Sequence, residues 1–127
     1  MQQPTTTQAL AIYTSLGDVE GFLVYPYLHN RRGEWIGWVT AQREVYSVHG
    51  DYVGWISKEP RLLAKRTRPY DKPKSTPPPM PQRIVPPSSM RLAPMMSELS
   101  YDTIDILQDE PERLPTIDAG ELRPDMD

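Results

Sequence analysis

The stretch Gly50-Asp51-Tyr52-Val53-Gly54-Trp55-Ile56 decides the fold, because the chain carries two earlier copies of it. The copies are Gly33-Glu34-Trp35-Ile36-Gly37-Trp38-Val39 and Gly17-Asp18-Val19-Glu20-Gly21-Phe22-Leu23, and successive copies start 16 and 17 residues apart. In each copy a glycine and an acidic residue favour a tight turn, and the apolar residues that follow are typical of a β-strand. A period this short corresponds to one hairpin per unit. The sequence therefore predicts an all-β domain of repeated short antiparallel hairpins.

The repeat also predicts where the strands lie. We expect three hairpins and a seventh short strand: Ala11–Leu16 with Val19–Tyr25, Tyr27–Arg31 with Trp35–Thr40, Glu44–Val48 with Tyr52–Ser57, and Arg61–Lys65. Strict alternation would put Trp35 and Gly37 on one face and Ile36 and Trp38 on the other. Both faces are apolar, so one is expected to fill the core and the other to meet a second layer, a partner or a second copy. The repeated glycine predicts a close approach by an aromatic ring of the neighbouring strand.

Composition limits this domain to the first half of the chain. The 127 residues include 15 prolines and are 38% hydrophobic, which allows one modest domain plus unfolded segments. Nine of the eleven aromatic residues lie between Tyr13 and Trp55. We therefore expect a disordered leader over residues 1–9, a β-hairpin domain over 10–68, a Pro-rich linker over 69–94 and a disordered acidic tail over 95–127. The linker, with nine prolines in 26 residues, is expected to be extended and to hold the tail away from the domain.

Charge is segregated along the chain. Residues 1–60 hold four Lys/Arg and six Asp/Glu, residues 61–94 hold eight and one, and residues 95–127 hold two and ten. The net charges are therefore −2, +7 and −8, which sum to the formal charge of −3. The chain shows no secretory signal and no apolar run near the roughly 20 residues that span a bilayer. A cytoplasmic location is expected.

The phrase from Val45 to Ile56, with looser copies at Ile12–Leu23 and Leu28–Val39, resembles the bacterial four-fold beta-flower repeat. That pattern has a Tyr, three residues, a Gly, a spacer and then a Gly followed by an aromatic residue. The resemblance covers residues 10–66 and implies short hairpins around a pseudo-symmetric axis. His29 stands where the other two units have Tyr13 and Tyr46, and no fourth full unit follows Ile56. The resemblance implies no site residue.

No catalytic or cofactor signature stands out. His29 and His49 are the only histidines and cysteine is absent, so neither a metal cluster nor a nucleophile with its base is assembled. The acidic residues Asp18, Glu34 and Asp51 occupy equivalent turn positions, where they satisfy local backbone donors. We expect a protein that is not an enzyme and holds no cofactor or metal.

The acidic tail is the favoured partner-binding segment. It mixes acids with spaced apolar residues, as segments do when they fold onto a partner. We expect a helix within Met95–Leu107 that forms on binding, capped at Asp102. The expected contact residues are Leu99, Tyr101, Asp102, Ile104, Ile106 and Leu107.

Two other surfaces stay open as alternatives. A platform of Trp and Arg side chains would suit single-stranded nucleic acid or glycan, and its residues would be Trp35, Trp38, Trp55, Arg31 and Arg32. A basic patch of Lys65, Arg66 and Arg68 would meet phosphates or anionic lipid, would be a solvated flank that blocks edge pairing, or would attract the chain's own acidic tail.

The interpretation that these observations favour is a bacterial, non-enzymatic adaptor or scaffold. Its β-domain would self-associate into a homo-oligomer and present the acidic docking tail to a protein partner. The alternative is a β-module that binds single-stranded nucleic acid or glycan through its Trp and Arg side chains.

Overall fold

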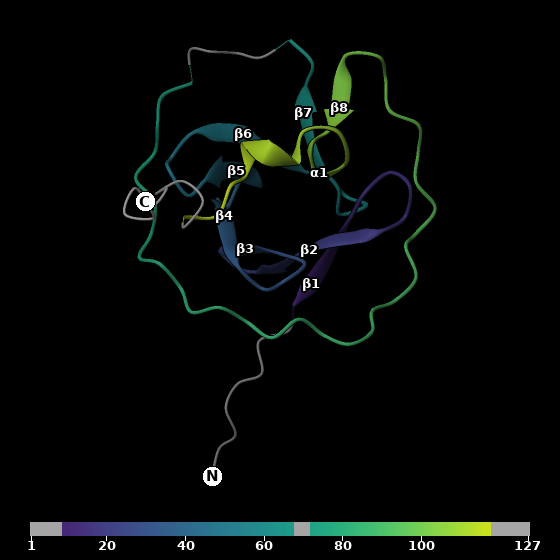
Figure 1. Ribbon diagram of the computed structural model, residues 1–127. Coiled ribbons are helices and arrows are strands. Elements are labelled where there is room, and N and C mark those ends of the chain that lie inside the picture. The colour runs from purple at the N-terminus through teal and green to yellow at the C-terminus, as the bar shows by residue number, and fades with distance from the viewer. Residues whose placement is uncertain (1–8, 68–71, 118–127) are drawn as a thin grey trace, which may run out of the picture.

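The computed structural model describes residues 9–67 and 72–117. Eight antiparallel strands follow one another in sequence order and form one sheet that curls into a half-barrel (Figure 1). The strands are β1 Leu10–Tyr13, β2 Val19–Val24, β3 Tyr27–Asn30, β4 Trp35–Val39, β5 Glu44–Ser47, β6 Tyr52–Ile56, β7 Leu62–Lys65 and β8 Thr103–Asp105. A single helical turn, α1 Ile106–Asp109, and a 3-10 turn, η1 Pro111–Arg113, follow β8. The predicted all-β hairpin fold is confirmed, as are the three hairpins and the seventh strand.

One side-chain device builds most of the turns. At five turns a Thr, Asn or Ser donates its backbone N–H to the carbonyl four residues on, and its side-chain oxygen accepts the N–H of that same residue. The five residues are Thr14, Asn30, Thr40, Ser47 and Ser57. Three of the turns place a glycine at φ between 85° and 92°, a region that side chains disfavour. This local chemistry explains why the hairpin boundaries are readable from the sequence.

Strict alternation along the repeat strands is wrong, because each unit contains a β-bulge. Opposite β3, Trp35 pairs with His29 and Gly37 with Leu28, so Ile36 is an extra residue. Register shifts at the equivalent place recur in the β1–β2 and β5–β6 pairs. A bulge turns two successive residues toward one side. Ile36 belongs to the core. Its neighbour Gly37 faces the same side, because a Cβ on Gly37 would lie 3.1 Å from the core side chain of Leu114.

The core lies inside the curl and includes side chains of the segment that follows β8. Its buried aliphatic side chains come from β1 and β3–β8 and from the segment after β8. We call residues Ile106–Leu114 the plug, because Figure 1 shows α1 inside the ring of strands. Leu107 lies 3.6 Å from the Cβ position of Gly21, and Leu114 lies beside Gly37. The expected aromatic neighbour of the repeated glycine is wrong: the plug and the backbone carbonyls of adjacent strands occupy that space.

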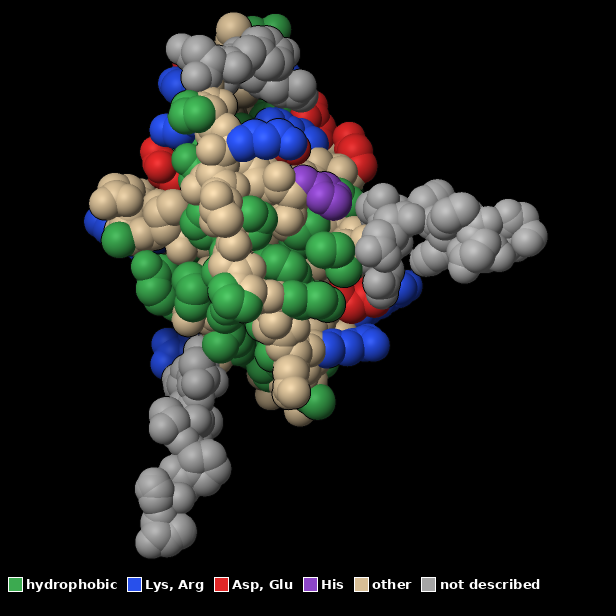
Figure 2. All heavy atoms as spheres, turned by 90° about the vertical axis from the view of Figure 1, so that its left-hand side faces the viewer, with side chains coloured by type: hydrophobic (Ala, Val, Ile, Leu, Met, Phe, Trp, Pro, Cys, Tyr) green, Lys and Arg blue, Asp and Glu red, His purple; other side chains and the backbone are tan. Residues whose placement is uncertain are grey.

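The Pro-rich segment runs around the outside of the sheet. We call residues 72–102 the strap, which appears in Figure 1 as an outer ring that carries the chain from β7 to β8. Its backbone docks on the glycine turns: Ser75 N–H donates to Gly50 O at 2.9 Å, and Ile84 N–H donates to Gly33 O at 3.1 Å. On the side shown in Figure 2, hydrophobic side chains gather across the middle of the face and charged ones lie at its margins.

The outer aromatic face thus has a second layer supplied by the same chain. The Tyr27 hydroxyl donates to Pro79 O at 3.0 Å, and the Tyr13 hydroxyl donates to Arg91 O at 2.9 Å. Because the strap stays on the sheet, the expected linker that holds a tail away from the domain is not what the structure shows. Residues 1–8, 68–71 and 118–127 of the expected leader, linker and tail lie outside the described residues.

The segment after the strap joins the domain. β8 pairs antiparallel with β7, Ile104 opposite Ala64, and the Ile104 side chain enters the core. In the free chain residues 95–102 form neither helix nor strand and Thr103–Asp105 is a strand, so the helix expected within Met95–Leu107 on binding stays a prediction. The helical turn begins only at Ile106, and its N-cap is Asp105, whose carboxylate accepts the N–H of Gln108. The segment joins the sheet because its apolar side chains Ile104, Ile106 and Leu107 are buried in the core.

Candidate functional site

The six residues expected to bind a partner are divided between the core and the surface. Ile104, Ile106 and Leu107 are buried in the core, so a partner reaches them only if β8 and the plug leave the sheet. Leu99 is half-buried on the strap. Tyr101 and Asp102 are exposed; Asp102 pairs with Lys65 of β7, and both residues accept a hydrogen bond from Arg66, which follows β7. Of the six residues, only Tyr101 and Asp102 are exposed on the free chain.

The basic patch meets the acidic segment of its own chain. Asp102 lies 3.2 Å from Lys65 Nζ, and the Arg66 guanidinium sits 4.6 Å from the centre of the Tyr101 ring. The Ser100 hydroxyl and Lys65 lower the pKa of Asp102 to about 2. The attraction between patch and tail is thus present at this point, while Arg68 lies outside the described residues.

The Trp and Arg platform is not assembled as one surface. Trp35 is buried and its indole N–H donates to Gly37 O at 2.7 Å. Trp38 is half-buried and stacks on Tyr46, with ring centroids 4.9 Å apart. Trp55 is half-buried and Arg32 is exposed. Arg31, also exposed, pairs with Glu20 at 3.4 Å. Packing within the chain thus buries Trp35 and occupies one face of Trp38, which reduces the aromatic surface left for stacking on a base or sugar.

Among residues 9–67 and 72–117, no group of three or more His, Asp or Glu side chains is placed to hold a metal ion. In the same ranges, no helix has the length and apolarity to cross a membrane. His29 is buried, and its Nδ1 lies 3.2 Å from Gly33 O. His49 is exposed at a turn. The two histidines therefore lie in different elements, His29 in β3 and His49 in the turn before β6, and in different environments.

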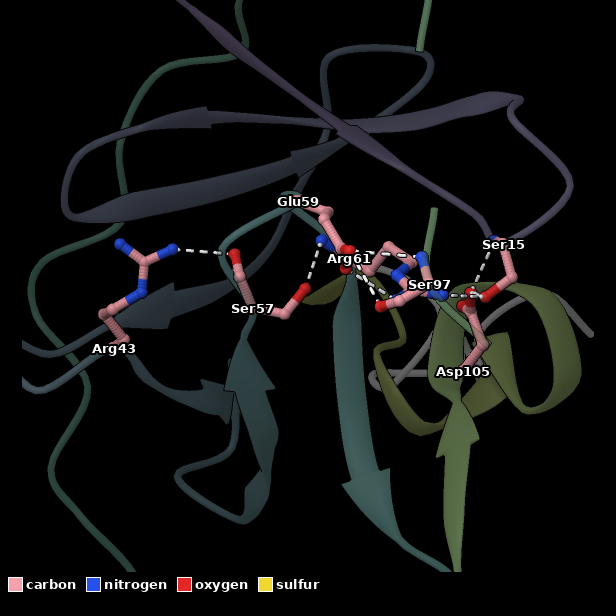
Figure 3. Close-up of polar contacts among 7 residues, drawn as sticks. All are labelled: Ser15, Arg43, Ser57, Glu59, Arg61, Ser97 and Asp105. Carbon is pink, nitrogen blue, oxygen red and sulfur yellow. Dashed lines mark hydrogen bonds and ion pairs between the residues drawn. The ribbon is translucent and has the colours of Figure 1, made fainter. Parts of the chain in front are cut away.

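A buried polar cluster closes the seam between the two ends of the sheet (Figure 3). Arg61 is only 2% exposed, and its guanidinium donates to Ser15 Oγ at 2.9 Å and Glu59 Oε1 at 2.6 Å. Ser15 donates from both its N–H and its hydroxyl to the Asp105 carboxylate, each at 2.7 Å. Glu59 in turn accepts from Ser97, at the end of the strap. These hydrogen bonds lower the pKa of Glu59.

We call Ser15, Glu59, Arg61, Ser97 and Asp105 the seam cluster, and its role is to join the two ends of the sheet. It ties the first turn, the turn before β7, the strap and β8 to one guanidinium, and the backbone adds a hydrogen bond from Tyr13 N–H to Pro60 O at 2.8 Å. A buried charge is stable only with partners such as these. The half-barrel is thus closed at this end without a fourth full hairpin unit.

The strongest candidate for a binding surface is a groove between β1 and the strap. It has a volume of about 1130 Å³ and is lined mainly by apolar side chains, among them Leu10, Val24, Ile84, Val85, Met90 and Leu92. Val85 is 90% exposed and Leu92 is 94% exposed, while Leu10 on β1 is 47% exposed. We call this surface the β1–strap groove. Exposed large apolar side chains at the rim of an apolar groove are typical of an interaction site.

The groove lining carries one charged side chain, Arg91. Among the described residues, no hydrogen bond or ion pair engages its guanidinium, although its backbone carbonyl accepts from Tyr13. A further exposed apolar residue, Tyr25, follows Val24 of the groove in the sequence and is 61% exposed. The surface thus combines exposed apolar groups with one cation that the rest of the described chain leaves unpaired.

The strap contains a nine-residue repeat that begins with a cation, and Leu92 stands where a third cation would be expected. Lys74-Ser75-Thr76-Pro77-Pro78 recurs nine residues later as Arg83-Ile84-Val85-Pro86-Pro87. Lys74 pairs with Asp51 at 3.5 Å, and Arg83 donates to Arg32 O at 3.0 and 3.1 Å. The next residue in this register is Leu92, which is almost fully exposed. The unit that lines the groove therefore replaces a paired cation with an exposed leucine.

Sequence reasoning missed the groove. The strap repeat was the available signal, since its period of nine residues runs alongside the hairpin repeat. The repeat indicates a groove only once the strap is known to return to the sheet, because Val85 and Leu92 form the groove together with β1.

We compared the chain with known protein families, curated proteins and solved structures. No family model, no curated protein and no solved structure matches this chain. The resemblance to the beta-flower repeat therefore stays a prediction.

Proposed function

We propose that this protein is a non-enzymatic adaptor that binds a protein partner through the β1–strap groove. The proposal keeps the class of function that the sequence favours and moves the binding surface from the acidic tail to the groove. One observation carries it: Leu10, Val85 and Leu92 expose large apolar side chains around one groove.

The energetics support a role in binding. Fully burying an aliphatic side chain contributes on the order of 1.5 to 3 kcal/mol. Val85 and Leu92 gain almost none of this in the free chain, because each is at least 90% exposed. Their burial would therefore become available on binding a partner, where a few such residues supply most of the affinity.

A charge-matched pair of variants tests the proposal. Val85→Asp with Leu92→Asp alters the groove, and Leu16→Asp with Met95→Asp alters two residues that are 77% and 92% exposed and do not line it. Both double variants should melt close to the parent, because surface substitutions usually change stability by about 0.5 kcal/mol or less. Tagged full-length chains are expressed at equal levels in the native cell, and proteins captured after cross-linking are purified and retested in binding assays.

The expected result is that a partner bound by the parent and the control is lost with the groove variant. If the groove variant retains every partner that the control retains, the proposal fails. Self-association, the other role expected from the sequence, gives a different result: light scattering would show a parent oligomer that the groove variant dissociates.

A further inference from the structure

Resting on the proposed function, the geometry points to a specific partner chemistry: a short peptide segment of apolar residues with one Asp or Glu, whose carboxylate binds Arg91. The apolar side chains of the segment would cover Leu10, Val85 and Leu92, and Arg91 would select the segment by charge. We infer this from the composition of the β1–strap groove and from the unpaired state of Arg91.

Charge complementarity favours an acidic segment as the occupant of the groove. Arg91 is exposed and lines the groove, and within the described ranges its guanidinium has no ion-pair partner. Lys72, Lys74 and Arg83 of the same strap each contact the sheet. A guanidinium beside an apolar surface is suited to a carboxylate, which it binds through paired hydrogen bonds.

The charge of the groove lining disfavours a second copy of the chain as the occupant. The lining residues of the groove include no Asp or Glu. Two copies that met groove to groove would bring two Arg91 guanidiniums to one apolar interface without a counter-charge. Like charges at an interface oppose association.

The number of cations in the groove favours a protein segment over a lipid surface. Anionic membranes are recognised by clusters of several Lys and Arg residues. The groove lining offers one cation, and the nearby Arg61 is buried in the seam cluster. A single cation among apolar groups is suited to binding one acidic side chain within an apolar segment.

The strap is suited to such specificity because its backbone is held in place. Ile84 N–H is bound to Gly33 O, and Arg91 O accepts from Tyr13. The two side chains that face the solvent, Val85 and Leu92, therefore project from an anchored backbone. An anchored surface loses less conformational entropy on binding than a free segment would.

The experiment is a selection with a displayed library of random twelve-residue peptides on the immobilised full-length protein. Counter-selection on the Val85→Asp with Leu92→Asp variant removes peptides that bind elsewhere. Enriched peptides should share apolar residues around an Asp or Glu. The best is synthesised with that acid and with the matching Asn or Gln, and titrated by calorimetry.

Arg91→Gln should weaken the acidic peptide about tenfold, whereas Arg32→Gln, an exposed arginine outside the groove, should leave affinity unchanged. The amide peptide should bind as weakly as the acidic peptide binds Arg91→Gln, and combining both changes should add little. Equal effects of Arg91→Gln and Arg32→Gln, or enriched peptides without an acid, overturn the inference.

Two further outcomes would also overturn it. Binding to phosphatidylglycerol vesicles that requires Arg91, with no peptide enriched, would assign the groove to a membrane. A dimer that dissociates in the Val85→Asp with Leu92→Asp variant would assign it to a second copy. If that variant loses its cellular partner while Arg91→Gln keeps it, the proposed function stands and the inference about the acid fails.

Discussion

The hairpin units of residues 10–66 and the returning segment of residues 72–117 are ordered by different means. In the units, a side chain at most of the turns accepts a backbone N–H only four residues away. In the returning segment, the bonding partners are distant: Ser75 contacts Gly50, Ile84 contacts Gly33, and Ser97 contacts Glu59. The first kind of order is local and the second depends on a sheet that is already folded. The difference teaches that the repeat alone does not complete this domain.

Removing the returning segment should have the largest effect. A chain of residues 1–67 lacks β8 and the buried side chains of Ile104, Ile106, Leu107 and Leu114. Each large-to-small loss in a core costs about 2 to 5 kcal/mol, and a domain has only about 5 to 15 kcal/mol in total. We expect this fragment to show no cooperative unfolding by circular dichroism and poorly dispersed amide NMR signals.

A well-dispersed spectrum from the fragment would contradict that expectation. It would show that the hairpin units fold alone, as the sequence analysis anticipated for residues 10–68.

A single substitution in the plug should have the next largest effect. Leu114→Ala removes a side chain that is 4% exposed and should destabilise the protein by about 2 to 5 kcal/mol. Leu92→Ala, at a strap position that is 94% exposed, should stay within about 0.5 kcal/mol of the parent. Urea unfolding of the full-length chain measures both. Equal midpoints for the two variants would mean that the plug does not pack in the core.

Glycine substitutions separate turn strain from strap contact. Gly17, Gly33 and Gly50 all have positive φ, so alanine strains each backbone to a similar degree. A Cβ on Gly33 would collide with the carbonyl of Ile84, whereas one on Gly17 would lie 3.8 Å from the Ala93 Cβ. Gly33→Ala should therefore cost about 1 to 3 kcal/mol more than Gly17→Ala, measured by thermal melts. Costs that do not differ would show that the strap does not press on the Gly33 turn.

The hairpin units also predict a small dependence on pH. Burial lowers the pKa of His29, against a raising effect of its hydrogen bond to Gly33. The unfolded chain then binds a proton more readily than the folded chain, so stability is complete above about pH 6.5 and falls as the pH drops toward the folded pKa. Melting temperatures between pH 7.5 and 5.5 should show this fall in the parent and in His49→Gln. A fall of the same size in His29→Gln would assign it to other groups.

The sequence could predict the hairpins because their signals are local: Gly50, Asp51 and the accepting Ser47 lie within one turn. It missed the β-bulge at Ile36, since alternation of apolar residues does not reveal an inserted residue. It identified Ile104, Ile106 and Leu107 as residues seeking burial but assigned them to a partner. Their actual neighbours, such as Gly21 beside Leu107, lie far away in the sequence, and no local signal pairs them.

The candidate groove illustrates the same limit. Val85 and Leu92 are unremarkable residues of a Pro-rich segment, and their exposure has meaning only where the strap crosses β1. The nine-residue strap repeat relates Leu92 to Lys74 and Arg83. That Leu92 lacks the contact made by these two cations is visible only in the structure, where Lys74 pairs with Asp51 and Arg83 donates to Arg32 O.

Amide hydrogen exchange of the full-length protein, measured residue by residue by NMR, tests most directly whether the returning segment completes the domain. The account predicts that amides of β8 and of Glu110, which donates to Ile106 O, are protected about as strongly as those of β4 and β6. It also predicts protected amides at Ser75 and Ile84, which bond to Gly50 and Gly33, with faster exchange at the exposed Val85 and Leu92. Exchange throughout residues 72–117 at the rates of an unfolded chain would contradict the account.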